Sequence, residues 1–138
     1  MEKANESPEH ADLLQMMLNH YKDQEYRILE AAADGYPEPN AIGRHEPDAL
    51  VRQPDGLLRI CEVETGLDGF ADETTTEQFK DFSNRVMRDG PQKGQQVPFD
   101  IAVPKNQVAS ITKVLAELGI KNKENGIGAH VEIWCPKN

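Results

Sequence analysis

Three acidic residues lie close together in residues 45–65, which read HEPDALVRQPDGLLRICEVET. Asp48 precedes one apolar run, and Glu62 and Glu64 end the next. Residues two apart on a strand share a face, and like charges on one face repel. Burying even one unpaired carboxylate costs several kcal/mol. We therefore expect these acids either to lie in water or to hold a positive charge between them.

The turn between the two runs decides whether Asp48 meets the glutamates. Pro54-Asp55-Gly56 is typical of a three-residue hairpin loop in which Gly takes the left-handed conformation. With that loop Gln53 faces Leu57, paired residue numbers sum to 110, and Asp48 lies opposite Glu62 on the same face. A four-residue loop would change the sum to 109 and place Asp48 on the other face.

Three carboxylates at one end of a hairpin favour a hard divalent cation. Mg²⁺ and Mn²⁺ prefer oxygen ligands, and either ion would neutralise Asp48, Glu62 and Glu64. A bound ion polarises a phosphoryl oxygen and lowers the pKa of a bound water, which is the usual route to metal-assisted hydrolysis. The pattern predicts a metal site with these three residues as ligands.

The first element is expected to be a helix from residue 8 to about residue 33. Ser7 is the expected N-cap, Pro8 the first helical residue, and Gly35 lies beyond the end. The apolar stripe of this helix runs through Glu25 in steps of three and four residues. Glu25 therefore either points toward the strand carboxylates or reaches solvent at the edge of the stripe.

The remaining pattern predicts short strands and two more helices. Strands are expected at residues 41–45, 48–53 and 57–64, and then a helix that begins with a Thr74–Glu77 capping box and ends before Gly90. A strand at 97–103, a helix at 106–118 and a strand at 129–134 follow. This order predicts one α/β domain, a mixed central sheet with helices on both faces.

Pro47-Asp48, followed after thirteen residues by Glu62-Val63-Glu64, resembles the motif of the PD-(D/E)XK nuclease superfamily, the restriction-endonuclease-like fold. The αβββαβ core of that fold matches the expected order over about residues 8–103 and leaves 104–138 as an extension. In the superfamily the Asp and the next acid bind the metal, and a Lys two residues later positions the attacking water. The resemblance implies a metal-dependent phosphodiesterase that cuts nucleic acid.

Helix residues extend the resemblance. Many members carry a Glu on the first helix, which would correspond to Glu25 or, as a weaker match, to Glu30. RecB-like members have a Gln on the helix after the third strand and an aromatic residue four positions later. Gln78 and Phe82 fit that pattern, with Phe where the family usually has Tyr.

One position departs from the family. Glu64 stands where the Lys is expected, which gives an E-x-E variant. The resemblance would make Glu64 a further metal ligand or the base that acts on water. Lys80 or Arg85, on the helix after the third strand, would then supply the missing positive charge. Arg59 suits this role less, because strand alternation points it away from the acids.

The overall charge opposes a tight nucleic-acid interaction. The net charge is −9 at pH 7, and polyanion binding depends on Lys and Arg displacing counterions. Arg85, Arg88, Lys93 and Lys105 are either a modest phosphate-tracking surface or scattered charge. A rival interpretation is a nuclease-like fold that no longer cleaves and binds protein or nucleic acid. Another is an unrelated α/β protein with exposed acids. A homodimer or a basic partner protein is also compatible with the sequence.

The cellular setting is inferred from what the sequence lacks. No apolar run is long enough to span a membrane, and the first residues lack a secretory signal pattern. Cys61 and Cys135 show no paired motif, and Cys61 is expected to be a buried free thiol. His45 is expected to be a solvated loop residue, although it could touch phosphate or metal. A cytoplasmic protein with reduced thiols is predicted.

Overall fold

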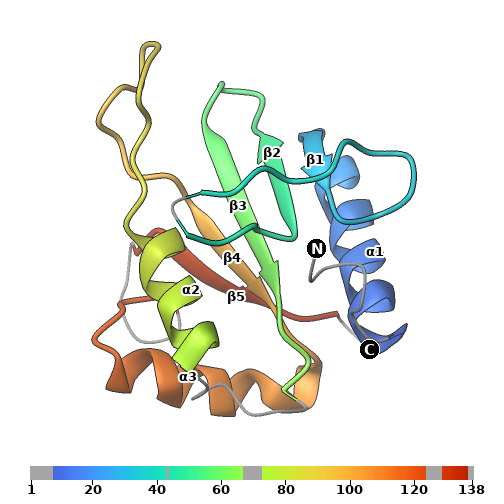
Figure 1. The fold of residues 1–138 in the computed structure, drawn as a ribbon, viewed down its shortest axis with the longest axis vertical. Helices are drawn as coiled ribbons and strands as arrows, with labels where there is room; N and C mark the ends of the chain where they lie inside the picture. Colours follow the sequence, from blue (N-terminus) through green and yellow to red (C-terminus); the bar gives the residue numbers. More distant parts are fainter. Residues whose placement is uncertain (1–7, 43, 67–72, 124–128, 137–138) are drawn as a thin grey trace.

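A computed structural model describes residues 8–42, 44–66, 73–123 and 129–136 of the protein (Figure 1). The elements in chain order are α1 (Pro8–Asp23), β1 (Arg27–Ala31), β2 (Ala49–Arg52), β3 (Leu58–Val63), α2 (Glu73–Ser83), β4 (Phe99–Ala102), the 3₁₀ turn η2 (Lys105–Gln107), α3 (Val108–Glu117) and β5 (Val131–Trp134). The strands form one five-stranded sheet in the order β1-β2-β3-β4-β5. The first two pairings are antiparallel and the last two are parallel, so the expected mixed α/β sheet is confirmed.

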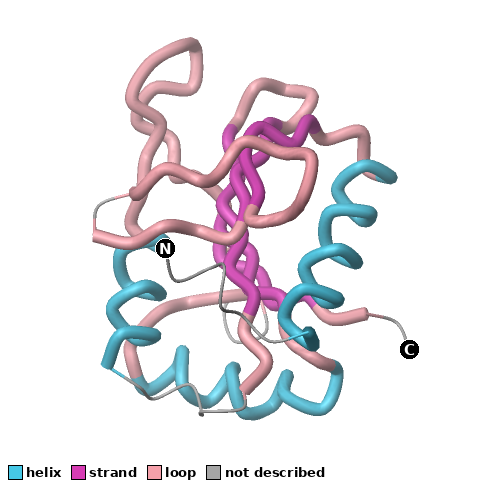
Figure 2. The backbone as a smooth tube through the Cα atoms, turned by 45° about the vertical axis from the view of Figure 1, so that its right-hand side comes forward, coloured by secondary structure: helices cyan, strands magenta, loops and turns pink. Residues whose placement is uncertain are grey.

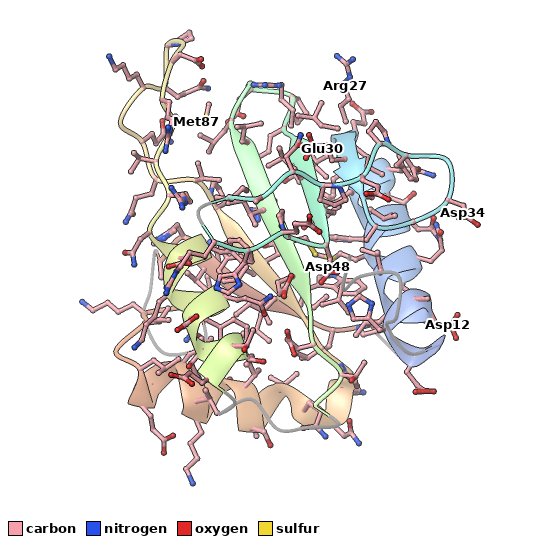
Figure 3. The ribbon with its side chains drawn as sticks, viewed as in Figure 1. Asp12, Arg27, Glu30, Asp34, Asp48 and Met87 are labelled. Atoms are coloured by element: carbon pink, nitrogen blue, oxygen red, sulfur yellow. The ribbon has the colours of Figure 1, made fainter. Side chains whose placement is uncertain are left out.

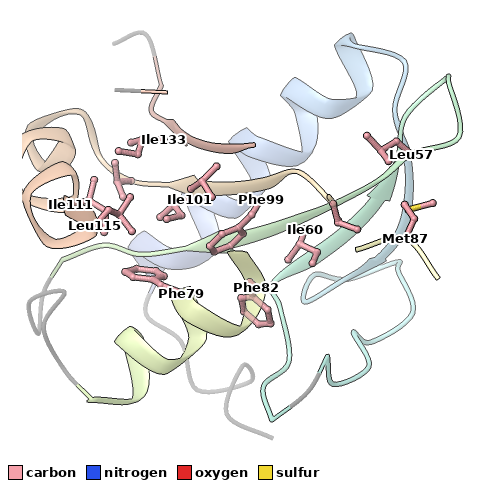
Figure 4. Packing of buried hydrophobic residues seen from close by; sticks show 13 residues of the cluster. Leu57, Ile60, Phe79, Phe82, Met87, Phe99, Ile101, Ile111, Leu115 and Ile133 are labelled. Atoms are coloured by element: carbon pink, nitrogen blue, oxygen red, sulfur yellow. The ribbon is translucent and has the colours of Figure 1, made fainter. Parts of the chain in front are cut away.

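The helices cover both faces of the sheet (Figures 1 and 2). On one face α1 packs across β1, β3 and β4 in what we name the α1-side core, which includes Leu14, Leu18, Val51, Cys61 and Val63. On the other face α2 and α3 pack in the α2/α3-side core, which includes Ile60, Phe79, Phe82, Phe99, Ile111 and Leu115 (Figure 4). The central strands β3 and β4 thus alternate their side chains between two buried layers, as expected for strands covered on both faces.

The β2–β3 hairpin has the predicted turn and register. The Gln53 amide donates to the Leu57 carbonyl at 2.8 Å, and Gly56 has a φ of 95°. Ala49 pairs with Cys61 and Arg52 with Leu58, so paired numbers sum to 110. The three-residue loop fixes this register because its left-handed third position is occupied by glycine.

The prediction that the first helix continues to about residue 33 is wrong. The helix ends at Asp23, and Glu25 has a φ of 64°. The amide of Tyr26 donates to the carbonyl of Tyr21, and that of Glu25 donates to Lys22. This is a Schellman ending with a non-glycine residue in the left-handed position. The following residues pair with β2 as the edge strand β1, an arrangement that the helical spacing of their apolar side chains concealed.

Two other boundaries differ from the expectation. Residues 41–45 form only an isolated bridge between Ile42 and His45, because β1 already occupies the edge beside β2. The second helix ends at Ser83 and not near Gly90. The side chains of Ser83 and Asn84 both donate to the carbonyl of Lys80. Lys80 lies in the last turn of the helix, where carbonyls lack a backbone partner within the helix, so these bonds stabilise the helix end.

The chain between α2 and β4 forms a narrow two-stranded arm, which rises beside the β2–β3 hairpin in Figure 1. Val86 pairs with Gln96, and the amide of Met87 donates to the carbonyl of Gln95 at 2.8 Å. Near its tip the Gln92 side chain donates to the carbonyl of Asp55 at 2.6 Å, which ties the arm to the hairpin turn. Within the described ranges, no helix combines the length and apolar character that a bilayer crossing requires.

Candidate functional site

Asp48 lies just before β2, at the open end of the β2–β3 hairpin (Figure 3). The Asp48 amide donates to the carbonyl of Cys61 at 3.0 Å, and its carboxylate Oδ2 accepts from the amide of Val63 at 2.8 Å. These two bonds reach the residues on either side of Glu62. The backbone of Asp48 is therefore held beside the end of β3 that carries Glu62, although Asp48 itself precedes β2.

The second oxygen of Asp48 faces the first helix. Oδ1 lies 3.3 Å from Nε2 of His10, and the side chains of these two residues are 0% and 7% exposed. His10 belongs to the first turn of α1, which packs over this face of the sheet. A protonated His10 would make this contact a buried ion pair, so the Asp48 carboxylate does not depend on solvent to balance its charge.

Glu62 is also buried, with 1% of its surface exposed. Its neighbours Cys61 and Val63 belong to the α1-side core, whereas Ile60 belongs to the α2/α3-side core. Strand alternation therefore points Glu62 toward the α2/α3 side. Asp48 precedes the first residue of β2, so the pleat does not hold its side chain, which turns toward α1. The predicted sharing of one face by the two carboxylates is thus not met.

Glu64 follows β3 and is half-buried, and its amide donates to the carbonyl of Ala102 at 2.9 Å. In the described ranges, no three His, Cys, Asp or Glu side chains form a group that could hold a metal ion. The predicted three-carboxylate cluster is therefore not assembled. Mg²⁺ is commonly held by one or two carboxylates together with waters and substrate phosphates. Asp48 and Glu62 supply two such carboxylates at the same end of the hairpin, but on opposite sides of the sheet, and metal binding stays a prediction.

The two glutamates predicted to assist from the first helix do not reach this region. Glu25 is exposed at the end of α1 opposite to His10, and a helix rises 1.5 Å per residue, which separates the two by about 20 Å. Glu30 lies on β1, where its carboxylate accepts from the backbone amide and the side-chain amide of Asn40. Glu25 terminates a helix and Glu30 anchors a loop.

The predicted residues of α2 take different positions. Phe82 is fully buried in the α2/α3-side core, and Gln78 is half-buried one turn earlier. Lys80 is exposed and lines a hollow of about 560 Å³ with Ser83, on the side of α2 toward His130. The described lining of that hollow contains none of the three predicted carboxylates. Lys80 is therefore not placed to replace the missing Lys of the motif.

The segment before Asp48 is held against α2 by charge. Arg44 donates through Nε and Nη2 to both carboxylate oxygens of Asp81, each at 3.1 Å. These bonds hold the pKa of Asp81 below its usual value. His45 is 13% exposed, and its Nε2 lies 3.6 Å from Glu77. His45 is thus a docking residue, which corrects the expectation of a solvated loop histidine.

A second buried polar cluster lies on the α1 side, and sequence reasoning missed it. The carboxylate of Asp100 accepts from the Tyr21 hydroxyl at 2.6 Å and from Arg59 at 2.8 Å. Burial raises the pKa of Asp100 to about 6, although the charge of Arg59 opposes the shift. Burial and the nearby Asp100 charge raise the pKa values of Tyr21 and Cys61 well above their usual values. The signal in the sequence was an acid inside the apolar run 97–103.

His10 is the other residue that the sequence did not reveal. It stands in the first turn of a helix, 38 positions before Asp48, and no local spacing relates the two.

Comparisons with protein-family models, with curated proteins and with solved structures returned no match.

Proposed function

We propose that the protein is a metal-dependent phosphodiesterase that acts on nucleic acid, on a fold of the restriction-endonuclease-like type. The observation that carries the proposal is the burial of two acids, Asp48 and Glu62, at the same end of the hairpin, where the Asp48 carboxylate accepts from the amide of Val63, the residue after Glu62. Burial costs several kcal/mol for each carboxylate that remains charged. Buried carboxylates that cost this much free energy cluster at binding and catalytic sites, where their negative charge has a role.

The element order supports this proposal. The chain runs α1, three antiparallel strands, α2 and then β4 parallel to β3, with α1 and α2 on opposite faces. This is the αβββαβ order of the family that the Pro47-Asp48 and Glu62-Val63-Glu64 motif resembles. The β4–α3–β5 segment extends the sheet at the edge away from β1.

The roles follow from the contacts. Asp48 and Glu62 would bind the divalent cation, and the Val63 amide would hold the Asp48 carboxylate at the sheet end. When bound, Mg²⁺ supplies polarisation of a phosphoryl oxygen and acidification of a water. Glu64, which follows β3 two residues beyond Glu62, would accept the proton of that water, since Lys80 lines a hollow that contains neither acid. His10 would balance the charge of Asp48 until the cation replaces it.

Isosteric variants test the proposal. Purified protein is mixed with labelled single-stranded and duplex DNA and RNA in the presence of Mn²⁺ or Mg²⁺, and Mn²⁺ binding is measured by calorimetry. We expect cleavage and Mn²⁺ binding in the wild type and the loss of both in Asp48→Asn and Glu62→Gln. Asp12→Asn, which changes an exposed acid of α1 near His10, is the matched control and should keep both. Cleavage by Asp48→Asn at the wild-type rate would end the assignment.

A second candidate is a nuclease-like fold that binds without cleaving. The contact between His10 and Asp48 favours it, because the acid already has a basic partner without any metal. The net charge of −9 also favours a role in which a basic partner protein delivers the nucleic acid. Calorimetry separates the two, since this candidate predicts no heat on Mn²⁺ addition. Either version suits a cytoplasmic protein with the free thiols Cys61 and Cys135.

A further inference from the structure

A groove lies between the arm and the β2–β3 hairpin, on the sheet face to which Glu62 points. It encloses about 380 Å³, within the usual size range of ligand pockets. Its floor is aliphatic and is formed by Leu50, Leu58 and Ile60 from the hairpin and by Met87 and Val97 from the arm. We name it the arginine groove, because Arg52, Arg85 and Arg88 line it together with one acid, Asp89.

The charge of this groove is opposite to that of the molecule. Three arginines against one aspartate give a local excess of positive charge, whereas the chain carries −9. Arg52 is held at the rim by a 2.8 Å bond from Nη1 to the Gly56 carbonyl, which leaves its other donors available. Arg88 is exposed. A concentrated positive patch on an acidic protein favours an anionic ligand at this place.

Arg85 provides a second, independent sign of a ligand. Its Nε is buried, and in the described part of the chain this atom has no hydrogen-bond partner. A buried donor without a partner costs about 1–3 kcal/mol. The nearby acid Asp81 is already bonded through both oxygens to Arg44. The donor capacity of Arg85 is therefore left for a group that enters the groove.

From these observations we infer that the arginine groove binds a short stretch of single-stranded nucleic acid, with phosphates on the three guanidinium groups and an unstacked base on the aliphatic floor. The inference rests on the proposed function and names its substrate class. Ile60 on the floor lies two residues before Glu62 on the same face of β3, about 6–7 Å along the strand, so a strand in the groove leads to the acids. In a duplex the base faces are stacked on one another, so no base could pack on the aliphatic floor of the groove.

The number of arginines sets a measurable salt dependence. For single strands, the logarithm of the binding constant falls with the logarithm of salt by about 0.7 for each phosphate neutralised. Three contacts predict a slope of about −2.1, and the loss of one contact predicts about −1.4. At 0.1 M salt the same relation makes each contact worth about fivefold in affinity.

The test is fluorescence anisotropy of a labelled single-stranded oligonucleotide in EDTA, so that binding is measured without cleavage. We expect a slope of about −2.1 for the wild type. Arg88→Gln and Arg52→Gln should each bind about fivefold more weakly with a shallower slope. Lys113→Gln, which removes an exposed charge from α3, should change neither value. A strand with abasic sites should bind more weakly than its intact counterpart, since it cannot use the floor.

Several results would overturn the inference. Unchanged affinity and slope in both arginine variants would remove the groove from the binding surface. Equal binding of duplex, or full displacement by a poly-glutamate peptide at equal charge concentration, would assign the groove to another anion. Arg88 is exposed, so its substitution does not endanger the fold, and the unfolding temperature of each variant confirms this. Binding without cleavage in Mn²⁺ would refute the phosphodiesterase alone, whereas cleavage with an unchanged KM in the arginine variants would refute the groove alone.

Discussion

Asp100 makes the stability of the protein depend on pH in a direction that can be measured. It lies in β4, in register with Cys61, and is 3% exposed. Burial raises its pKa from 3.8 to about 6, while the charge of Arg59 and the hydrogen bond from Tyr21 oppose the rise, and Glu132 adds to it. Replacing Asp100 by asparagine keeps the shape and removes the ionisation.

The sign and size follow from linkage. Because the folded-state pKa is higher than the unfolded value, the folded protein binds more protons between about pH 3.8 and 6. The contribution of Asp100 is therefore fully present below pH 3.8 and is lost as the pH rises to 6. The shift of about two units corresponds to about 3 kcal/mol at 1.36 kcal/mol per unit. The Asp100→Asn protein lacks this loss.

The assay is urea unfolding between about pH 4 and pH 7, followed by the fluorescence of the single tryptophan, Trp134. The free energy of unfolding of Asp100→Asn minus that of the wild type should rise by about 3 kcal/mol over this range. Taking the difference cancels every other titrating group. Asp12→Asn, an exposed acid, should give a flat difference. A flat line for Asp100→Asn would show that Arg59 and Tyr21 balance the effect of burial, and a line that falls with pH would show that they outweigh it; either result would refute the reasoning.

Three further predictions concern packing, reactivity and backbone strain. Phe82→Ala should lower the free energy of unfolding by about 3–5 kcal/mol, because the side chain is fully buried. Val86→Ala, at an exposed position, should change it by less than about 0.5 kcal/mol. Equal losses of unfolding free energy for the two variants in urea melts would contradict the described packing. A thiol reagent should modify Cys135 in the native protein and Cys61 only in urea, because Cys61 is buried and burial raises its pKa. Modification of both cysteines in the native protein would argue against the burial of Cys61. Gly56→Ala should cost about 1–2 kcal/mol because φ is 95° there, and an unchanged unfolding temperature would mean that the turn can rearrange.

The hairpin could be predicted from the sequence because its determinants are local. Pro54-Asp55-Gly56 specifies the loop by the backbone angles of three residues, and the loop fixes the register of both strands. That register is confirmed as far as the Ala49–Cys61 pair, whereas Asp48, one residue earlier, bonds through its amide to Cys61 and turns its side chain toward His10. The amphipathic spacing of the second helix predicts a core face of Phe79, Phe82 and Val86; the two phenylalanines are buried, whereas Val86 lies beyond the end of α2 and is exposed.

The errors arose where distant residues decide the outcome. The apolar spacing after Glu25 is helical, but pairing with β2 turns residues 27–31 into a strand. The end of α1 had no glycine to mark it, since Glu25 itself takes the left-handed angle. The partner of Asp48 was also invisible, because a contact between α1 and the hairpin depends on how the helix crosses the sheet. The Asp48 side chain therefore points toward His10, and not in the direction that strand alternation predicts.

The two buried aspartates of the sheet differ in the kind of compensation they receive, and the difference bears on which one can bind a cation. Asp100 is held by Arg59 and by the Tyr21 hydroxyl, and a guanidinium never gives up its charge in a protein. A metal ion approaching Asp100 would meet a fixed positive charge. Asp48 faces His10, whose ring can be neutral, and its other oxygen is held by a neutral backbone amide. Under the proposed function, a cation would displace the partner of Asp48 without leaving a second charge buried, so we expect it to bind at Asp48 and not at Asp100.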